Sequence, residues 1–266
     1  MVKLYKTFIW SNIPIALDAA AWTGLTYKAL YMEIDWVMVF ISFGFTWLFY
    51  TKDRTDASPS DIINNPDRTA WYARQTMIKP IMWLVAAELL ICLSQRLSIL
   101  IPALIGIVPC LLYTKQLTIK GYTFSLKALP GIKALLVAFL WVVLTVVFPV
   151  ITIKTDLPTS IITQLSFMIG FFVMLQINTN DLRDIEGDTK EGVKSFAVLL
   201  GDKKARFLGI LMIVLGVYFG WYIFERIPLF VFSVFLIVRT FMYKKEADIY
   251  WQLPISLQGV LAYLIL

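Results

Sequence analysis

Histidine is absent from this 266-residue chain, and cysteine occurs only twice. The lack of histidine excludes imidazole both as a metal ligand and as a general base. Cys92 and Cys110 fall within apolar stretches, where two packed thiols are expected rather than a disulfide. A metal site in this protein therefore has to be built from other side chains, and carboxylates are the candidates.

Apolar residues are what the chain has in excess. They make up 59% of the sequence, aromatic residues make up 15%, and the mean hydropathy is +0.75. Soluble domains contain roughly 45–50% apolar residues, so this composition indicates an integral membrane protein. The pI of about 9.2 reflects basic residues confined to short loops, which favours a role in membrane topology over nucleic-acid binding.

The apolar runs predict an all-α membrane protein, organised as one domain over residues 1–266. A helix needs about 20 apolar residues to cross a bilayer. By that rule the sequence predicts nine spans, at residues 7–29, 34–50, 70–93, 97–114, 132–153, 160–179, 206–224, 228–243 and 250–266.

The predicted loops differ in charge between the two sides of the membrane. Most lysines and arginines fall at the N-terminus and in loops 51–69, 115–131, 180–205 and 244–249, while the opposite loops carry few. Because basic loops stay in the cytoplasm, we expect this side to be cytoplasmic, in a prokaryotic inner membrane. Two acidic segments of the chain also fall on that side.

The more informative acidic segment comes after the sixth predicted span. Asn178, Asp181, Asp184 and Asp188 share one face at helical spacing. Mg²⁺ prefers oxygen ligands, and one or two carboxylates together with phosphate oxygens suit it. The alternative is a solvated acidic loop, but these carboxylates begin where an apolar span ends. We therefore interpret Asp181, Asp184 and Asp188 as metal ligands and catalytic residues.

The second acidic segment lies far upstream, after the second predicted span. Asp53 and Asp56 are three residues apart, and Asp61 comes after Pro59, which interrupts any helix. By itself this segment reads as a polar loop. Facing the downstream segment, its three aspartates would form the other half of a site in which Mg²⁺ ions hold a diphosphate.

Basic and amide side chains complete the candidate site. A diphosphate needs cationic partners besides metal, although loop-end charges also arise from membrane topology alone. The candidates for diphosphate binding on the cytoplasmic side are Arg68, Lys115, Lys120, Lys127 and Arg183. Polar residues at membrane depth are functional candidates, and among them Asn12, Gln176 and Asn178 are expected to line a substrate cavity.

These motifs resemble the UbiA superfamily of intramembrane prenyltransferases. The run from Asn180 to Gly201 is similar, almost residue by residue, to the second aspartate motif of that family and its trailing Ala-Val-x-Leu-Gly. Residues 63–69 reproduce the Ile-Asn-x-Pro-Asp-Arg tail of the first motif. The first motif itself departs from the usual Asn-Asp-x-x-Asp-x-x-x-Asp, because Asp53 stands at the asparagine and Ala57 replaces the middle aspartate.

The resemblance implies a helical bundle around a central cavity open to the bilayer, with Mg²⁺ on the aspartates gripping an isoprenyl diphosphate. An aromatic, quinone-precursor or lipid acceptor would attack the allylic cation formed on ionisation. The departure at Ala57 keeps a terpene cyclase, in which the substrate attacks its own cation, as the alternative. A transporter is disfavoured because the acidic groups crowd one side of the membrane instead of lining a path through it.

Overall fold

Helices account for most of the regular structure. The computed structural model describes residues 2–114, 117–119, 122–124, 129–153, 156–244 and 248–266. Its helices are α1 (Val2–Trp10), α2 (Ile13–Ala29), α3 (Trp36–Thr55), α4 (Pro59–Asn64), α5 (Pro66–Ala73), α6 (Ile78–Ser94), α7 (Leu97–Thr114), α8 (Ile132–Val142), α9 (Phe148–Thr152), α10 (Thr159–Glu191), α11 (Phe196–Gly220), α12 (Arg226–Met242), α13 (Asp248–Ser256) and α14 (Gln258–Ile265). A π-helical turn at Val143–Val147 joins α8 to α9, and β1 (Leu117–Ile119) pairs antiparallel with β2 (Tyr122–Phe124).

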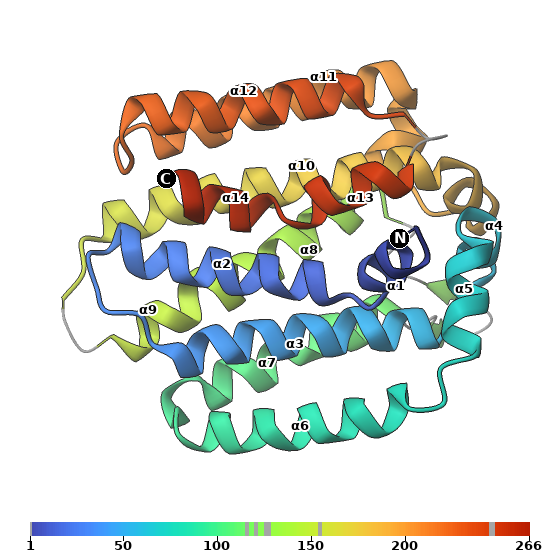
Figure 1. Cartoon of the computed structure of the whole chain (residues 1–266), viewed down its shortest axis with the longest axis horizontal. Helices are drawn as coiled ribbons and strands as arrows, with labels where there is room; N and C mark the ends of the chain where they lie inside the picture. Colours follow the sequence, from blue (N-terminus) through green and yellow to red (C-terminus); the bar gives the residue numbers. More distant parts are fainter. Residues whose placement is uncertain (1, 115–116, 120–121, 125–128, 154–155, 245–247) are drawn as a thin grey trace.

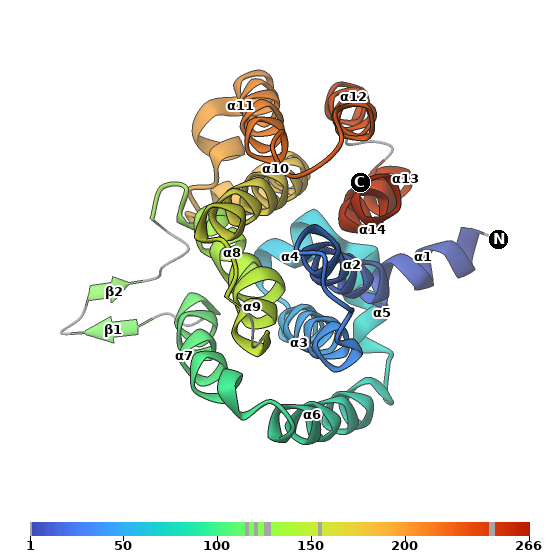
Figure 2. The ribbon, with the colours of Figure 1, turned by 90° about the vertical axis from the view of Figure 1, so that its left-hand side faces the viewer.

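The long helices lie side by side along the longest axis of the molecule, and α4 and α5 lie across the end at which α3 finishes (Figure 1). In the end-on view of Figure 2, α2 lies among α3, α10 and α14, and it packs against each of them. The β1–β2 hairpin projects away from the bundle in the same view. This arrangement confirms an all-α architecture, apart from that one hairpin.

The number of membrane spans remains a prediction. Within the described residues, two helical stretches are long and apolar enough to cross a membrane, namely Ile132–Thr152 and Thr159–Glu191. A third joins them if Pro66–Ala73 and Ile78–Ser94, which meet at 82°, form one bent span. Two of the predicted spans are broken helices in the structure, because α1 and α2 are separated near Asn12 and α13 and α14 near Leu257.

The prediction of a loop at residues 180–205 was wrong. Helix α10 continues without a break to Glu191, and Gly192 in the left-handed conformation (φ 73°) ends it. The acidic part of the helix is stabilised by nearby cations, including Lys190, whose Nζ donates to Glu186 Oε1 at 2.9 Å one turn away. Residues 159–179 form the apolar part of α10, and residues 180–191, which we call the acidic end of α10, lie beyond it.

Aromatic side chains fill the centre of the bundle. Trp22 on α2 stacks on Phe172 of α10 with ring centroids 6.1 Å apart, and Phe172 meets Phe232 of α12 edge-on at 5.3 Å. All three side chains are fully buried. Offset and edge-on aromatic pairs are favourable beyond the apolar area that they bury, so they fix how α2, α10 and α12 sit against one another.

A buried polar network attaches the C-terminal helices to this core. Asp18 of α2 accepts hydrogen bonds from the backbone N–H of Gly259, at the start of α14, and from Gln176 Nε2 at 3.1 Å. Gln176 also donates to the carbonyl of Ile255 at 2.6 Å. A Cβ on Gly259 would lie 2.5 Å from the Trp22 ring, so α14 can approach α2 this closely only with glycine there.

We expect Asp18→Asn to lower the free energy of unfolding by about 2–3 kcal/mol. The two carboxylate oxygens of Asp18 accept from Gly259 and Gln176. In the variant, the N–H₂ group of the amide would face one of these donors, which leaves buried polar groups unpaired. Thermal unfolding in detergent measures the change, with Asp156→Asn, an exposed acid, as the control. Equal melting temperatures for the two variants would contradict the role assigned to Asp18.

Candidate active site

The two acidic segments come together at one end of the bundle, where α4 packs on the acidic end of α10. Asn64 at the end of α4 makes the central contact: its Nδ2 donates to the carbonyl of Asp184 at 3.2 Å, and its Oδ1 accepts from the N–H of Gly187 at 2.9 Å. The N–H of Ser60 donates to Glu191 Oε1 at 2.9 Å. The expectation that segments more than 100 residues apart face each other is thus met.

Gly187 makes this docking possible. A Cβ at this position would lie 2.3 Å from Asn64 Nδ2 and 2.6 Å from Asn64 Cγ, far inside van der Waals contact. Gly187 has ordinary helical geometry, so the requirement for glycine comes from the close approach of Asn64 and not from backbone conformation. The register of α4 on α10 therefore depends on this glycine.

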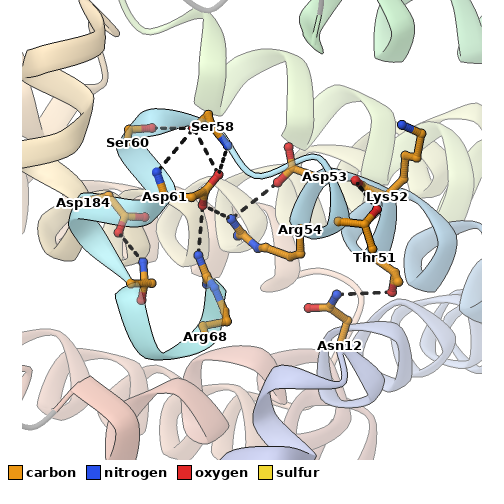
Figure 3. A network of polar contacts seen from close by, with 12 residues as sticks. Asn12, Thr51, Lys52, Asp53, Arg54, Ser58, Ser60, Asp61, Arg68 and Asp184 are labelled. Carbon is orange, nitrogen blue, oxygen red and sulfur yellow. Dashed lines mark hydrogen bonds and ion pairs between the residues drawn. The ribbon is translucent and has the colours of Figure 1, made fainter. Parts of the chain in front are cut away.

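Asp61 is the central acid of the upstream segment. Its Oδ1 accepts from Arg54 Nη1 at 2.7 Å and from Arg68 Nη2 at 3.1 Å (Figure 3). Its Oδ2 accepts from the backbone N–H of Ser58 at 3.2 Å and from the Ser58 hydroxyl at 3.1 Å, which caps α4. Burial opposes ionisation, but the two arginines hold the pKa of Asp61 below its usual value.

The other two upstream acids lie in different surroundings. Asp53 Oδ2 is 3.5 Å from Arg54 Nη1, so Asp53 joins the group around Asp61 through that arginine (Figure 3). Asp56, in contrast, forms an ion pair with Lys52 one turn back, and its side chain is 62% exposed. The structure therefore brings Asp53 and Asp61 to the site and places Asp56 apart from it, on the exposed surface.

The downstream acids are also held by cations. Arg183 donates to both carboxylate oxygens of Asp184, from Nε and Nη2, each at 2.7 Å. Burial works against the charge on Asp184, but this bidentate pair holds its pKa well below the usual range. Lys133, at the start of α8, lies 2.7 Å from Asp181 Oδ1 and 2.9 Å from Asp188 Oδ2.

Asp181 is the most enclosed acid of the group, with only 1% of its side chain exposed. Burial raises its pKa to about 6, against the opposing effect of Lys133. Among the residues that the structure describes, none donates a hydrogen bond of normal geometry to either oxygen, so the close contact with Lys133 is an ion pair without an aligned hydrogen bond. Buried carboxylate oxygens without hydrogen bonds are uncommon, and such oxygens are suited to binding a cation.

The chemistry of these donors fits Mg²⁺, although the acids do not form a ready metal cage. In the part of the chain that the structure describes, no three carboxylates converge on one point. The oxygens of Asp181, Asp184 and Asp188 nevertheless line one face at the acidic end of α10, as the spacing predicted, and hard oxygen donors are what Mg²⁺ prefers. In this structure the three acids are paired with basic groups, Asp184 with Arg183 and the other two with Lys133.

Two of the five basic residues predicted to bind diphosphate, Arg68 and Arg183, lie in this group. Lys115, Lys120 and Lys127 lie outside the described residues. The sequence reasoning missed Arg54 and Lys133 as site residues. The position of Lys133 in the sequence did indicate an acidic partner. A lysine in the first turn of an apolar helix is disfavoured by the helix dipole, and an acidic neighbour offsets that effect.

The three amide residues predicted for a substrate cavity hold helices together in this structure. Asn12 Nδ2 donates to the Tyr72 hydroxyl at 2.7 Å and to Thr51 Oγ1 at 3.3 Å, which connects the α1–α2 corner to α3 and α5. Asn178 Nδ2 donates to the carbonyl of Ala205 on α11 at 2.8 Å. Gln176 is committed to its hydrogen bonds with α2 and α13. These contacts position the helices that carry the site.

Comparison with known proteins places this arrangement in a family. The model of the UbiA prenyltransferase family matches residues 66–252, a range that contains the acidic end of α10 and begins just after Asp61. A digeranylgeranylglyceryl phosphate synthase from Methanobrevibacter smithii is 26% identical over 210 residues, which are 77% of this chain and 71% of that protein.

Solved structures share the fold across the whole chain. One from work on a digeranylgeranylglyceryl phosphate synthase in membranes has a TM-score of 0.56 at 20% identity, and covers 100% of this chain and 99% of its own. A UbiA homologue from Archaeoglobus fulgidus, described as bound to GPP and Mg²⁺, has a TM-score of 0.57 at 15% identity, with coverage of 98% and 97%. Together with the family match over most of its length, this fold identifies the chain as a member of the UbiA prenyltransferase family.

Proposed function

We propose that this protein is a Mg²⁺-dependent intramembrane prenyltransferase that uses an isoprenyl diphosphate. The observation that carries the proposal is the docking of Asn64 on Asp184 and Gly187, which gathers two acidic segments and three arginines at one end of an apolar bundle. The name of the relative from M. smithii and the GPP and DMAPP described in the A. fulgidus structures support the same substrate class.

In this proposal the acids bind metal and the arginines bind phosphate. Asp181, Asp184 and Asp188, with Asp53 and Asp61 across the site, would hold Mg²⁺, which neutralises charge on the departing diphosphate. Aligning the upstream segment on the family pattern puts Arg54 where that pattern has its first aspartate. Arg54, Arg68 and Arg183 would offer planar donors to the phosphate oxygens.

The proposed reaction is a substitution at the allylic carbon. The C–O bond breaks with its electron pair on the diphosphate, a nucleophilic atom of the acceptor bonds to the carbon, and the acceptor then loses a proton to solvent. We propose a lipophilic acceptor, which reaches the site from the bilayer, in the class of aromatic compounds, quinone precursors or glycerol-based lipids. The relative from M. smithii favours the last of these.

The test is diphosphate release by the purified protein in lipid nanodiscs, with geranyl, farnesyl or geranylgeranyl diphosphate and one acceptor class at a time. We expect release to require both Mg²⁺ and an acceptor, and to fall to background when EDTA removes the metal. Release that EDTA does not change would contradict the metal assignment. A cyclic terpene in hexane extracts, formed without any acceptor, would identify a terpene cyclase instead.

A further inference from the structure

Lys133 lies between two buried acids that would otherwise repel each other. Its ammonium is 2.7 Å from Asp181 Oδ1 and 2.9 Å from Asp188 Oδ2, while the side chains of these acids are only 1% and 7% exposed. Water therefore cannot compensate the two carboxylates, and a cation must stand between them. Without metal, Lys133 is the cation that bridges them.

The contacts of Lys133 with its acids differ in geometry from those of Arg183. Arg183 makes two parallel bonds to Asp184, whereas Lys133 is a point charge on a flexible stem, 20% exposed, with one close contact to each acid. Its contact with Asp181 is not an aligned hydrogen bond. Lys133 also sits in the first turn of α8, where the helix dipole disfavours a positive charge. Of the two cations, Lys133 is the easier one to displace.

We propose that Lys133 is the resident counter-ion of the metal-free site, and that a divalent cation and the Lys133 ammonium compete for Asp181 and Asp188. The inference rests on the metal assignment in the proposed function. A divalent cation on these carboxylates and an ammonium still in contact with them would lie within a few ångströms of each other in a site that water hardly enters, where like charges repel strongly. Metal binding therefore requires the ammonium to leave.

Manganese binding without substrate tests this competition directly. We expect Lys133→Met, which keeps the length of the side chain and removes the charge, to bind Mn²⁺ at least about tenfold more tightly than the wild type, measured by electron paramagnetic resonance on the full chain in detergent. Lys133→Arg keeps the charge and should bind no more tightly than the wild type. Arg96→Met, which breaks the ion pair with Asp35 away from the site, is the matched control and should leave Mn²⁺ binding unchanged.

Thermal stability distinguishes competition from a purely structural ion pair. Lys133→Met should melt at a lower temperature than the wild type in EDTA, because two buried acids lose their cation. Mg²⁺ should restore most of that loss, since it takes the place of the ammonium, whereas it should not restore the stability of Arg96→Met. Lys133→Met that binds Mn²⁺ as the wild type does, or more weakly, would overturn the inference.

A measurement on the wild type covers the case in which Lys133→Met does not fold. We expect acetylation of Lys133 by an amine reagent, detected by mass spectrometry, to become several-fold faster when Mg²⁺ is added. Lys28, an exposed lysine at the end of α2, is the internal reference and should not respond. Labelling of Lys133 that slows or stays constant would overturn the proposal. If neither the wild type nor the variant binds Mn²⁺, the metal assignment in the proposed function fails together with it.

Discussion

Asp184→Asn is expected to lower kcat/KM for diphosphate release by about a thousandfold, the loss typical when one preorganised electrostatic group is removed from a site. The amide keeps the shape of the side chain but removes the negative charge that a metal would need. It also presents an N–H₂ group to Arg183, which donates to both oxygens of Asp184 in the native protein. Release of diphosphate under saturating Mg²⁺ measures the effect.

The control for this variant lies two residues along the same helix. Glu186 pairs with Lys190, and its side chain is 59% exposed, so Glu186→Gln removes the same charge from the acidic end of α10 outside the site. We expect Glu186→Gln to retain activity within about twofold, since exposed ion pairs contribute little. Similar losses in the two variants would mean that the general charge of this helix, and not the Asp184 carboxylate, supports the reaction.

Gly187→Ala is expected to separate the two halves of the site. The new methyl group would overlap Asn64, whose Nδ2 lies 2.3 Å from the Cβ position, so the Asn64 side chain must move and give up its bonds to the backbone of α10. We expect a loss of about 2–3 kcal/mol in the free energy of unfolding. Asp61 lies on α4, and it pairs with Arg54 of α3 and Arg68 of α5, so these pairs would be disturbed and kcat/KM should fall by about a hundredfold.

Two comparisons isolate the cause of that loss. Gly170→Ala lies on the same helix, and its Cβ would meet Val142 at 3.5 Å, an ordinary contact, so this variant should be as stable as the wild type or more stable. In an Asn64→Ala background the overlap is gone, and Gly187→Ala should then stabilise the protein by up to about 1 kcal/mol. A loss of stability that is the same in both backgrounds would show that Asn64 is not what the methyl group meets.

These variants address a site that its own side chains have already neutralised. Asp61 forms ion pairs with two arginines and Asp184 with one, while Asp181 and Asp188 both pair with the same lysine. Buried acids require such partners in the absence of metal, because the cost of burying an unpaired charge is several kcal/mol. Each of these acids therefore has a basic partner, and under the proposed function metal and diphosphate would compete with those pairs.

Several features of this protein are determined by the sequence alone. The apolar composition requires helices that bury or hide their backbone polar groups, so the helical architecture was predictable. The spacing of Asp181, Asp184 and Asp188 places them on one helical face, and the structure agrees. The similarity of the run from Asn180 to Gly201 to a known motif identified the family, and the comparison with known proteins agrees.

Other features were decided by contacts between distant residues. The continuation of α10 to Glu191 depends on cations that neutralise its acids, and one of these, Lys133, lies about 50 residues away in the sequence. The separation of Asp56 from Asp61 depends on where α3 ends and α4 begins. The side-chain amides of Gln176 and Asn178 form hydrogen bonds with residues of α2, α11 and α13. Local periodicity contains no information about such partners.

The sequence by itself determined the class of the protein, the family, and the residue types that the chemistry requires, since these depend on composition and on short spacings along a helix. Only the tertiary structure decided which cation faces which carboxylate. The ion pair between Lys133 and Asp188 forms because α8 packs against α10, and the hydrogen bond from Ser60 to Glu191 forms because α4 packs against α10 through Asn64 and Gly187. The energy of a charge pair falls with distance and with exposure, and packing sets both.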